Sequence, residues 1–153
     1  MPETGPGEPV QRNNLWPSIR TVEDARMETA MGTAGLFLGI IGTIAAMLGH
    51  HHSVWHVLAV GTVPEGLDPA RFVPTLLAGQ IAAFAIVAVQ LWRGAALGLA
   101  VLSFVILAAE FAVRVVSGAG AHMVFLHMAA TAYCLTAVRA SWFIRRSRAA
   151  APA

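Results

Sequence analysis

The run MGTAGLFLGIIGTIAAMLG (residues 31–49) contains no charged side chain, which is typical of a helix surrounded by lipid. A helix of about 20 apolar residues is long enough to cross the hydrocarbon core of a bilayer. Three later runs have a comparable length and apolar character, at residues 72–92, 95–117 and 121–144. The sequence therefore predicts an all-α protein, an integral membrane four-helix bundle whose membrane domain covers residues 21–144.

The composition of the whole chain supports a membrane environment. Of its 153 residues, 57% are hydrophobic and only 12% are charged, whereas soluble domains average about 25% charged residues. The basic residues flank the apolar runs and form no patch of the kind that binds nucleic acid, so we expect no nucleic-acid partner. All ten basic residues are arginine and alanine is abundant, a composition typical of a GC-rich bacterial genome.

The arginines predict the direction of the spans, because cytoplasmic loops are enriched in positive charge. If both termini are cytoplasmic, one arginine, Arg71, falls in a loop on the outer side, and Arg114 lies inside the third span. The remaining eight fall on the cytoplasmic side: Arg12, Arg20, Arg26, Arg93, Arg139, Arg145, Arg146 and Arg148. We therefore expect a bacterial inner-membrane protein with both termini in the cytoplasm.

The segments outside the spans are short. Residues 1–20 are rich in Pro, Gly and Glu and predict a disordered cytoplasmic tail. Thr21 and Asp24 have the spacing of a capping box, so we expect a short N-terminal cytoplasmic amphipathic helix that runs into the first span. Asp68 followed by Pro69 predicts another helix start. Residues 145–153 form a basic cytoplasmic tail.

Small residues repeat along the first span with spacings of 3, 4, 3, 4 and 3, which places them on one face of a helix. Lipid tails give helices no hydrophobic reason to associate, so close backbone approach over small residues holds them together. The stripe either packs inside the chain, which we favour, or forms a contact with a second copy or a larger complex. Its members are Gly32, Gly35, Gly39, Gly42, Ala46 and Gly49.

Polar residues inside the spans form the strongest candidate site. Glu110 and Arg114 are four apart and share a helix face, and a charge at the bilayer centre costs about 3 kcal/mol or more. At 1.5 Å per residue, Glu110, His127 and Gln80 lie about 10, 9 and 12 Å below the outer ends of their spans. A buried polar cluster is expected, either as a structural network or as a proton or ion relay, a small polar substrate pocket, or a docking point.

The stretch GHHHSVWH (residues 49–56) places four of the six histidines at the outer end of the first span. Neutral imidazole is the commonest metal ligand, and a helical site would pair His52 with His56. A bis-histidine haem needs one deep histidine on each of two facing helices, and only His127 is deep enough. We expect a helix end at the headgroup level and no cofactor, with a metal or haem site as the alternative. The candidate ligands are His50, His51, His52, His56, His122 and His127.

The sequence contains no Walker loop, dinucleotide fingerprint, HExxH, GxSxG or CxxC motif, so no catalytic residue is predicted. Trp16–Pro17 and the run VRASWFIRR (residues 138–146) give the chain a layout that resembles small uncharacterised four-helix bacterial inner-membrane proteins. The resemblance implies the fold and no activity.

Three functions are therefore open. The chain is expected to be a non-catalytic accessory or scaffold subunit of a larger membrane complex or homo-oligomer. The alternatives are a small transporter or proton or ion channel that uses the buried polar cluster, and a periplasm-facing redox subunit that binds metal or haem through its histidines.

Overall fold

The computed structural model describes residues 19–49, 66–93 and 97–150. Within these ranges the chain forms four helices and no strand. All four helices are long and apolar enough to cross a membrane, which confirms the prediction of an all-helical, multi-pass membrane protein. The helices are α1 (Val22–Gly49), α3 (Pro69–Arg93), α4 (Leu97–Val116) and α5 (Ala121–Ala150).

Both predicted helix starts have the expected capping geometry. The Asp24 N–H donates to Thr21 Oγ1 at 3.0 Å and the Thr21 N–H donates to Asp24 Oδ2 at 2.9 Å, which are the reciprocal bonds of a capping box. At the start of α3, the Ala70 N–H donates to Asp68 Oδ1 at 3.0 Å. Pro69 occupies the first helical position, where a missing N–H costs no hydrogen bond.

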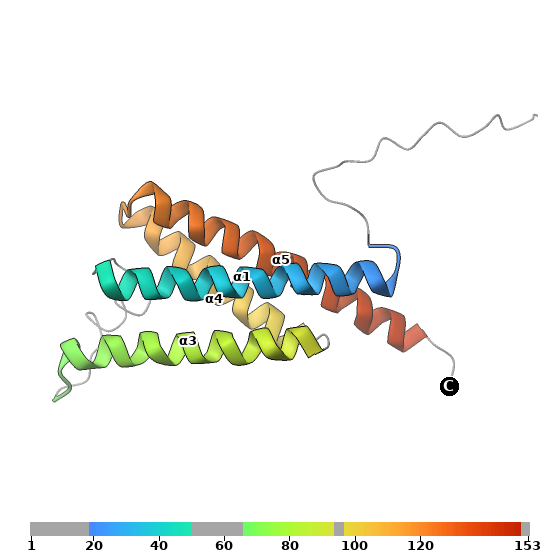
Figure 1. Cartoon of the computed structure of the whole chain (residues 1–153), viewed down its shortest axis with the longest axis horizontal. Coiled ribbons are helices and arrows are strands. Elements are labelled where there is room, and N and C mark those ends of the chain that lie inside the picture. Colours follow the sequence, from blue (N-terminus) through green and yellow to red (C-terminus); the bar gives the residue numbers. More distant parts are fainter. Residues whose placement is uncertain (1–18, 50–65, 94–96, 151–153) are drawn as a thin grey trace, which may run out of the picture.

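Helix α1 is continuous across the predicted cytoplasmic helix and the first span, and α5 continues six residues beyond the predicted fourth span, through residues 145–150. The predicted disordered tail lies outside the described residues except for Ile19 and Arg20. Helix α1 packs against α5 along most of its length and against α3 on another side, while α4 packs mainly against α5. Helices α1 and α5 run in opposite directions, and α1 begins at the end of the bundle where α3 and α5 finish (Figure 1).

The turn between α4 and α5 has a hydrogen-bond pattern that fixes its geometry. The Ala119 N–H donates to the Arg114 carbonyl at 3.0 Å and the Gly118 N–H donates to the Val115 carbonyl at 3.4 Å, the pair of bonds that defines a Schellman motif. Gly118 has a φ of +68°, a conformation that glycine adopts without a steric penalty. The short turn makes α4 and α5 antiparallel neighbours.

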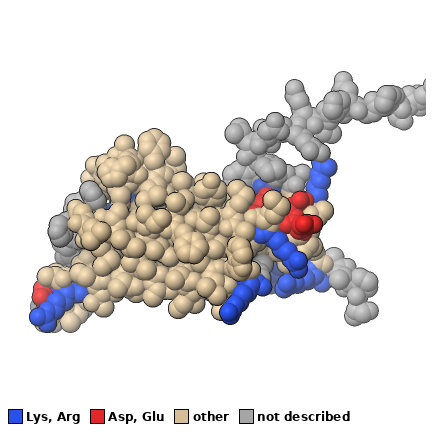
Figure 2. All heavy atoms as spheres, in the orientation of Figure 1, with Lys and Arg blue, Asp and Glu red and all other residues tan. Residues whose placement is uncertain are grey.

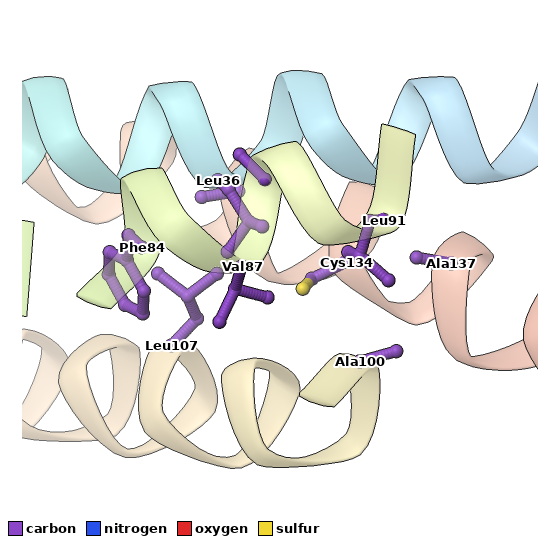
Figure 3. Close-up of a cluster of buried hydrophobic side chains, with 10 residues drawn as sticks. Leu36, Phe84, Val87, Leu91, Ala100, Leu107, Cys134 and Ala137 are labelled. Atoms are coloured by element: carbon purple, nitrogen blue, oxygen red, sulfur yellow. The ribbon is translucent and has the colours of Figure 1, made fainter. Parts of the chain in front are cut away.

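The four helices meet in one apolar core near the middle of the bundle. Leu36 of α1, Phe84 of α3, Leu107 of α4 and Cys134 of α5 are each at most 1% exposed. Figure 3 shows Leu36 and Leu107 reaching toward Phe84 and Val87 from opposite sides. Each helix therefore contributes one buried stripe, and the rest of its surface faces outward.

The outward-facing surface has the distribution expected of a protein surrounded by lipid. Charged side chains gather at the two ends of the visible face, and the middle of that face is made of other residues (Figure 2). Large apolar side chains are exposed on several helices, among them Phe37 at 56%, Ile86 at 62% and Phe125 at 63%. Apolar surface of this kind is stable in contact with hydrocarbon.

Candidate functional site

The polar residues of α4 lie on its buried face. The buried positions of α4 recur every three or four residues, which places them on one side of the helix. This face is apolar near the start of α4 and becomes charged toward its end, so the two ionisable side chains lie inside the bundle and away from lipid. The buried residues are Ala100, Ser103, Leu107, Glu110 and Arg114.

Arg114 lies at the centre of a buried polar triad with Glu110 and His127. Its Nη2 contacts Glu110 Oε2 at 3.3 Å, and its Nε–H donates to Nε2 of His127 at 3.1 Å. Glu110 and His127 are 1% exposed and Arg114 is 0% exposed. The arginine therefore joins a carboxylate on its own helix to an imidazole on α5.

The hydrogen bonds of His127 define its tautomer. Its Nδ1 lies 2.9 Å from the Met123 carbonyl oxygen, which can only accept, so Nδ1 carries a proton. Nε2 receives the Arg114 Nε–H, so its lone pair is engaged and it carries none. His127 is therefore a neutral Nδ1–H imidazole that acts as an acceptor for Arg114.

Helix α1 packs against the triad at His127. A side-chain carbon added at Gly42 would collide with Cε1 of His127, so the imidazole ring lies directly against the α1 backbone. The absence of a side chain at Gly42 is what gives the ring this space.

Gln80 has its polar contact with Thr43 of α1 and not with a member of the triad. Its Nε2 donates to Thr43 Oγ1 of α1 at 3.4 Å, and Thr43 Oγ1 donates to the Gly39 carbonyl at 2.9 Å. Gln80 is 6% exposed, and its Oε1 has no hydrogen-bond partner among the described residues. Of the four residues predicted to form one cluster, three are joined by polar contacts, and the contact of Gln80 ties α3 to α1.

The glycine stripe of α1 packs inside the chain. A side-chain carbon at Gly32 would collide with Ala137, and one at Gly35 would lie 2.7 Å from Tyr133 Cβ and 2.9 Å from the Ala130 carbonyl oxygen of α5. Gly39 faces Leu107 and Phe84 instead. The face of α1 that carries Gly32, Gly35, Gly39 and Gly42 is thus filled by this chain's own helices.

The burial of the stripe stops before its last member, since Ala46 is buried and Gly49 is exposed. At its other end the stripe meets an ion pair that the sequence analysis did not predict. Arg139 Nη2 lies 3.1 Å from Glu28 Oε1, and Thr136 Oγ1 donates to the Glu28 carbonyl at 3.1 Å. Glu28 is four residues before Gly32, so it continues the stripe by one helical turn. This spacing in the sequence could have indicated that Glu28 lies on the contact face of α1.

Most of the histidines proposed as metal ligands, His50, His51, His52 and His56, lie outside the described residues. His122 is exposed at the start of α5. Within residues 19–49, 66–93 and 97–150, no three His, Cys, Asp or Glu side chains are grouped as metal ligands would be. His127 has its Nε2 lone pair engaged by Arg114 and its Nδ1 bonded to the Met123 carbonyl, so neither of its ring nitrogens is available to a haem iron.

The fold and the site together define a multi-pass, all-helical membrane protein with a buried polar triad enclosed by α1, α4 and α5. Comparisons of the chain with protein-family models, with curated proteins and with solved structures found no match.

Proposed function

We propose that the chain is a non-catalytic multi-pass membrane protein that acts as an accessory or scaffold subunit of a larger membrane complex. The observation that carries the proposal is the closure of the polar triad. The three side chains of the triad are at most 1% exposed. The bond from Arg114 to His127 joins α4 to α5, and the remaining bonds fix Glu110 and His127 on their own helices. Groups used in this way stabilise a helix contact.

A transporter or channel that uses these residues needs them to change partners or meet water. His127 accepts from an arginine and so cannot take up a proton at Nε2 without losing that bond. Two cavities of the described chain are lined by residues of α1, α3 and α5, and neither is lined by a member of the triad. This arrangement supports a structural role over a relay.

A redox subunit that binds metal or haem would use the outer histidines. His127 would have to exchange Arg114 for the iron, and the buried Nε–H of Arg114 would then lose its acceptor on His127, which is costly. The accessory proposal requires no cofactor.

We propose a bacterial inner-membrane location with both termini in the cytoplasm. The end of the bundle where α1 begins and where α3 and α5 finish (Figure 1) carries Arg20, Arg26, Arg93 and the basic end of α5. The opposite end carries Arg71, which contacts Asp68 at 3.9 Å. Cytoplasmic surfaces of membrane proteins have this excess of positive charge.

Purification of the tagged full chain from its native membrane in a gentle detergent tests the proposal. We expect a stoichiometric set of membrane partners, identified by mass spectrometry, and recovery of this chain when a partner carries the tag. The same sample is examined for a Soret band and for bound metal.

Two results contradict the proposal. One is a chain that purifies alone and, in liposomes, supports an ion flux that Glu110→Gln abolishes while the fold is intact. The other is a Soret band or a stoichiometric metal in the purified chain, which supports the redox alternative.

A further inference from the structure

A cavity of about 620 Å³ lies at the arginine-rich end of the bundle. Residues near the start of α1 and near the ends of α3 and α5 line it. Each of these helices contributes one arginine to the cavity wall, Arg26 from α1, Arg93 from α3 and Arg148 from α5. Three positive charges from three helices therefore surround one space.

Among the described residues, no carboxylate in the wall balances the positive charge of this cavity. No described residue of the wall is an aspartate or a glutamate. Within the described ranges, none of Arg26, Arg93 and Arg148 is in an ion pair with a carboxylate. Guanidinium groups bind phosphate through paired hydrogen bonds, so the chemistry that fits this cavity is a phosphate anion.

A second cavity, of about 360 Å³, continues from the first between α1 and α3. The two cavities share Ala30 and Trp92 in their walls. The second is bounded by Ala34 and Phe37 on α1 and by Ala88 on α3, and its walls are almost entirely apolar. From Ala30 to Phe37 the groove follows α1 for about 10 Å toward the middle of the bundle.

We propose that the two cavities form one site for an anionic phospholipid of the surrounding bilayer, with the phosphate among the three arginines and an acyl chain in the groove between α1 and α3. The charge of the first cavity selects an anion, and the apolar groove that opens from it selects an amphiphile. A free phosphate fills the first cavity only, and an apolar helix of a partner fills the groove only. The site does not depend on the identity of any partner protein.

Native mass spectrometry of the full chain in detergent micelles tests the site. Dioleoylphosphatidylglycerol is titrated as the anionic lipid, dioleoylphosphatidylcholine as the zwitterionic lipid, and inorganic phosphate as the free anion. The double variant Arg26→Gln/Arg148→Gln removes two cavity arginines. Its matched control is Arg145→Gln/Arg146→Gln, since these exposed arginines of α5 are not in the cavity wall.

A second pair of variants tests the groove. Ala34→Trp fills the groove from an exposed position on α1, and Ala109→Trp adds the same side chain at an exposed position of α4 outside the groove. Protection of the buried Cys134 thiol from a water-soluble maleimide shows that each variant is folded. Cys134 is the only cysteine of the chain and is fully buried.

We expect phosphatidylglycerol to bind more tightly than phosphatidylcholine. Loss of two arginines near a membrane surface should weaken phosphatidylglycerol binding about thirtyfold, whereas the Arg145/Arg146 control should change it little. Ala34→Trp should remove most of the binding, and Ala109→Trp should not.

Three results overturn the proposal. The first is equal binding of the two lipids. The second is equal loss in a variant and its matched control. The third is displacement of the lipid by inorganic phosphate together with unchanged binding in Ala34→Trp, which identifies a site for a free anion.

Discussion

The Nε–H of Arg114 donates a 3.1 Å hydrogen bond to Nε2 of His127, across the contact between α4 and α5. Neither side chain is more than 1% exposed. The same guanidinium contacts Glu110 one turn earlier on α4. Glu110 on the same helix therefore balances the positive charge of the arginine. The neutral imidazole of His127 accepts its hydrogen bond and joins it to the neighbouring helix.

Arg114→Met should destabilise the bundle strongly, because it leaves the carboxylate of Glu110 buried beside an imidazole that has lost its donor. Breaking a buried ion pair by removing one partner typically costs about 3–5 kcal/mol. Thermal unfolding in detergent, followed by maleimide labelling of the buried Cys134 thiol, measures the loss. An unfolding temperature equal to that of the unaltered protein would show that the pair contributes little.

Gly35→Ala should destabilise the contact between α1 and α5 by about 1–3 kcal/mol, the usual cost of overpacking. The added carbon would lie 2.9 Å from the Ala130 carbonyl oxygen, a backbone atom that cannot rotate away. Gly79→Ala is the matched control, since nothing lies within 4 Å of the carbon it adds. Removing a glycine from a helix interior gains up to about 1 kcal/mol, so the control should be neutral or stabilising. Equal destabilisation by both substitutions would contradict the packing described for the stripe.

His127 should carry one proton, on Nδ1. Nitrogen-15 NMR of the protein labelled at histidine, compared with a His127→Gln sample to assign the signal, reports which ring nitrogen bears hydrogen. We expect a protonated Nδ1 and an unprotonated Nε2 at neutral pH, because the Met123 carbonyl accepts at one position and Arg114 donates at the other. A proton on Nε2 would be incompatible with the described hydrogen bond.

The ion pair between Glu28 and Arg139 should couple the start of α1 to the end of α5. The side chains are 13% and 26% exposed, so the pair is only partly screened by its surroundings. A double-mutant cycle with Glu28→Gln and Arg139→Gln should give a coupling energy of about 1 kcal/mol, read from the same Cys134 labelling. Additive effects of the two substitutions would show that the contact does not contribute.

The helices could be located from the sequence because the length and apolar composition of a helix depend only on consecutive residues. The runs at 72–92 and 95–117 differ from α3 and α4 by at most three residues at either end. The caps at Thr21 and Asp68 were also predictable, because capping depends on residues close together in the chain.

The site was predictable only in part, because depth along a helix axis is a single coordinate. Depth placed Glu110, His127 and Gln80 at one level, but the rotation of each helix decides which of them meet. The rotation of α3 places Gln80 against Thr43. The glycine stripe indicates the contact face of α1, but it does not indicate that α5 is the helix that packs there. The pairing of Glu28 with Arg139 could not be predicted for the same reason, because it requires α5 to be the neighbour of α1.

We propose that the triad holds helices together and performs no chemistry. The triple variant Glu110→Leu/Arg114→Met/His127→Leu tests this role, since replacing a whole buried ionic group with apolar residues of similar volume is often neutral or stabilising. We predict that this variant keeps Cys134 protected and purifies with the same partners as the unaltered chain. A variant that is folded by the same criterion but has lost its partners, or has lost an ion flux that the unaltered chain supports in liposomes, would contradict the claim.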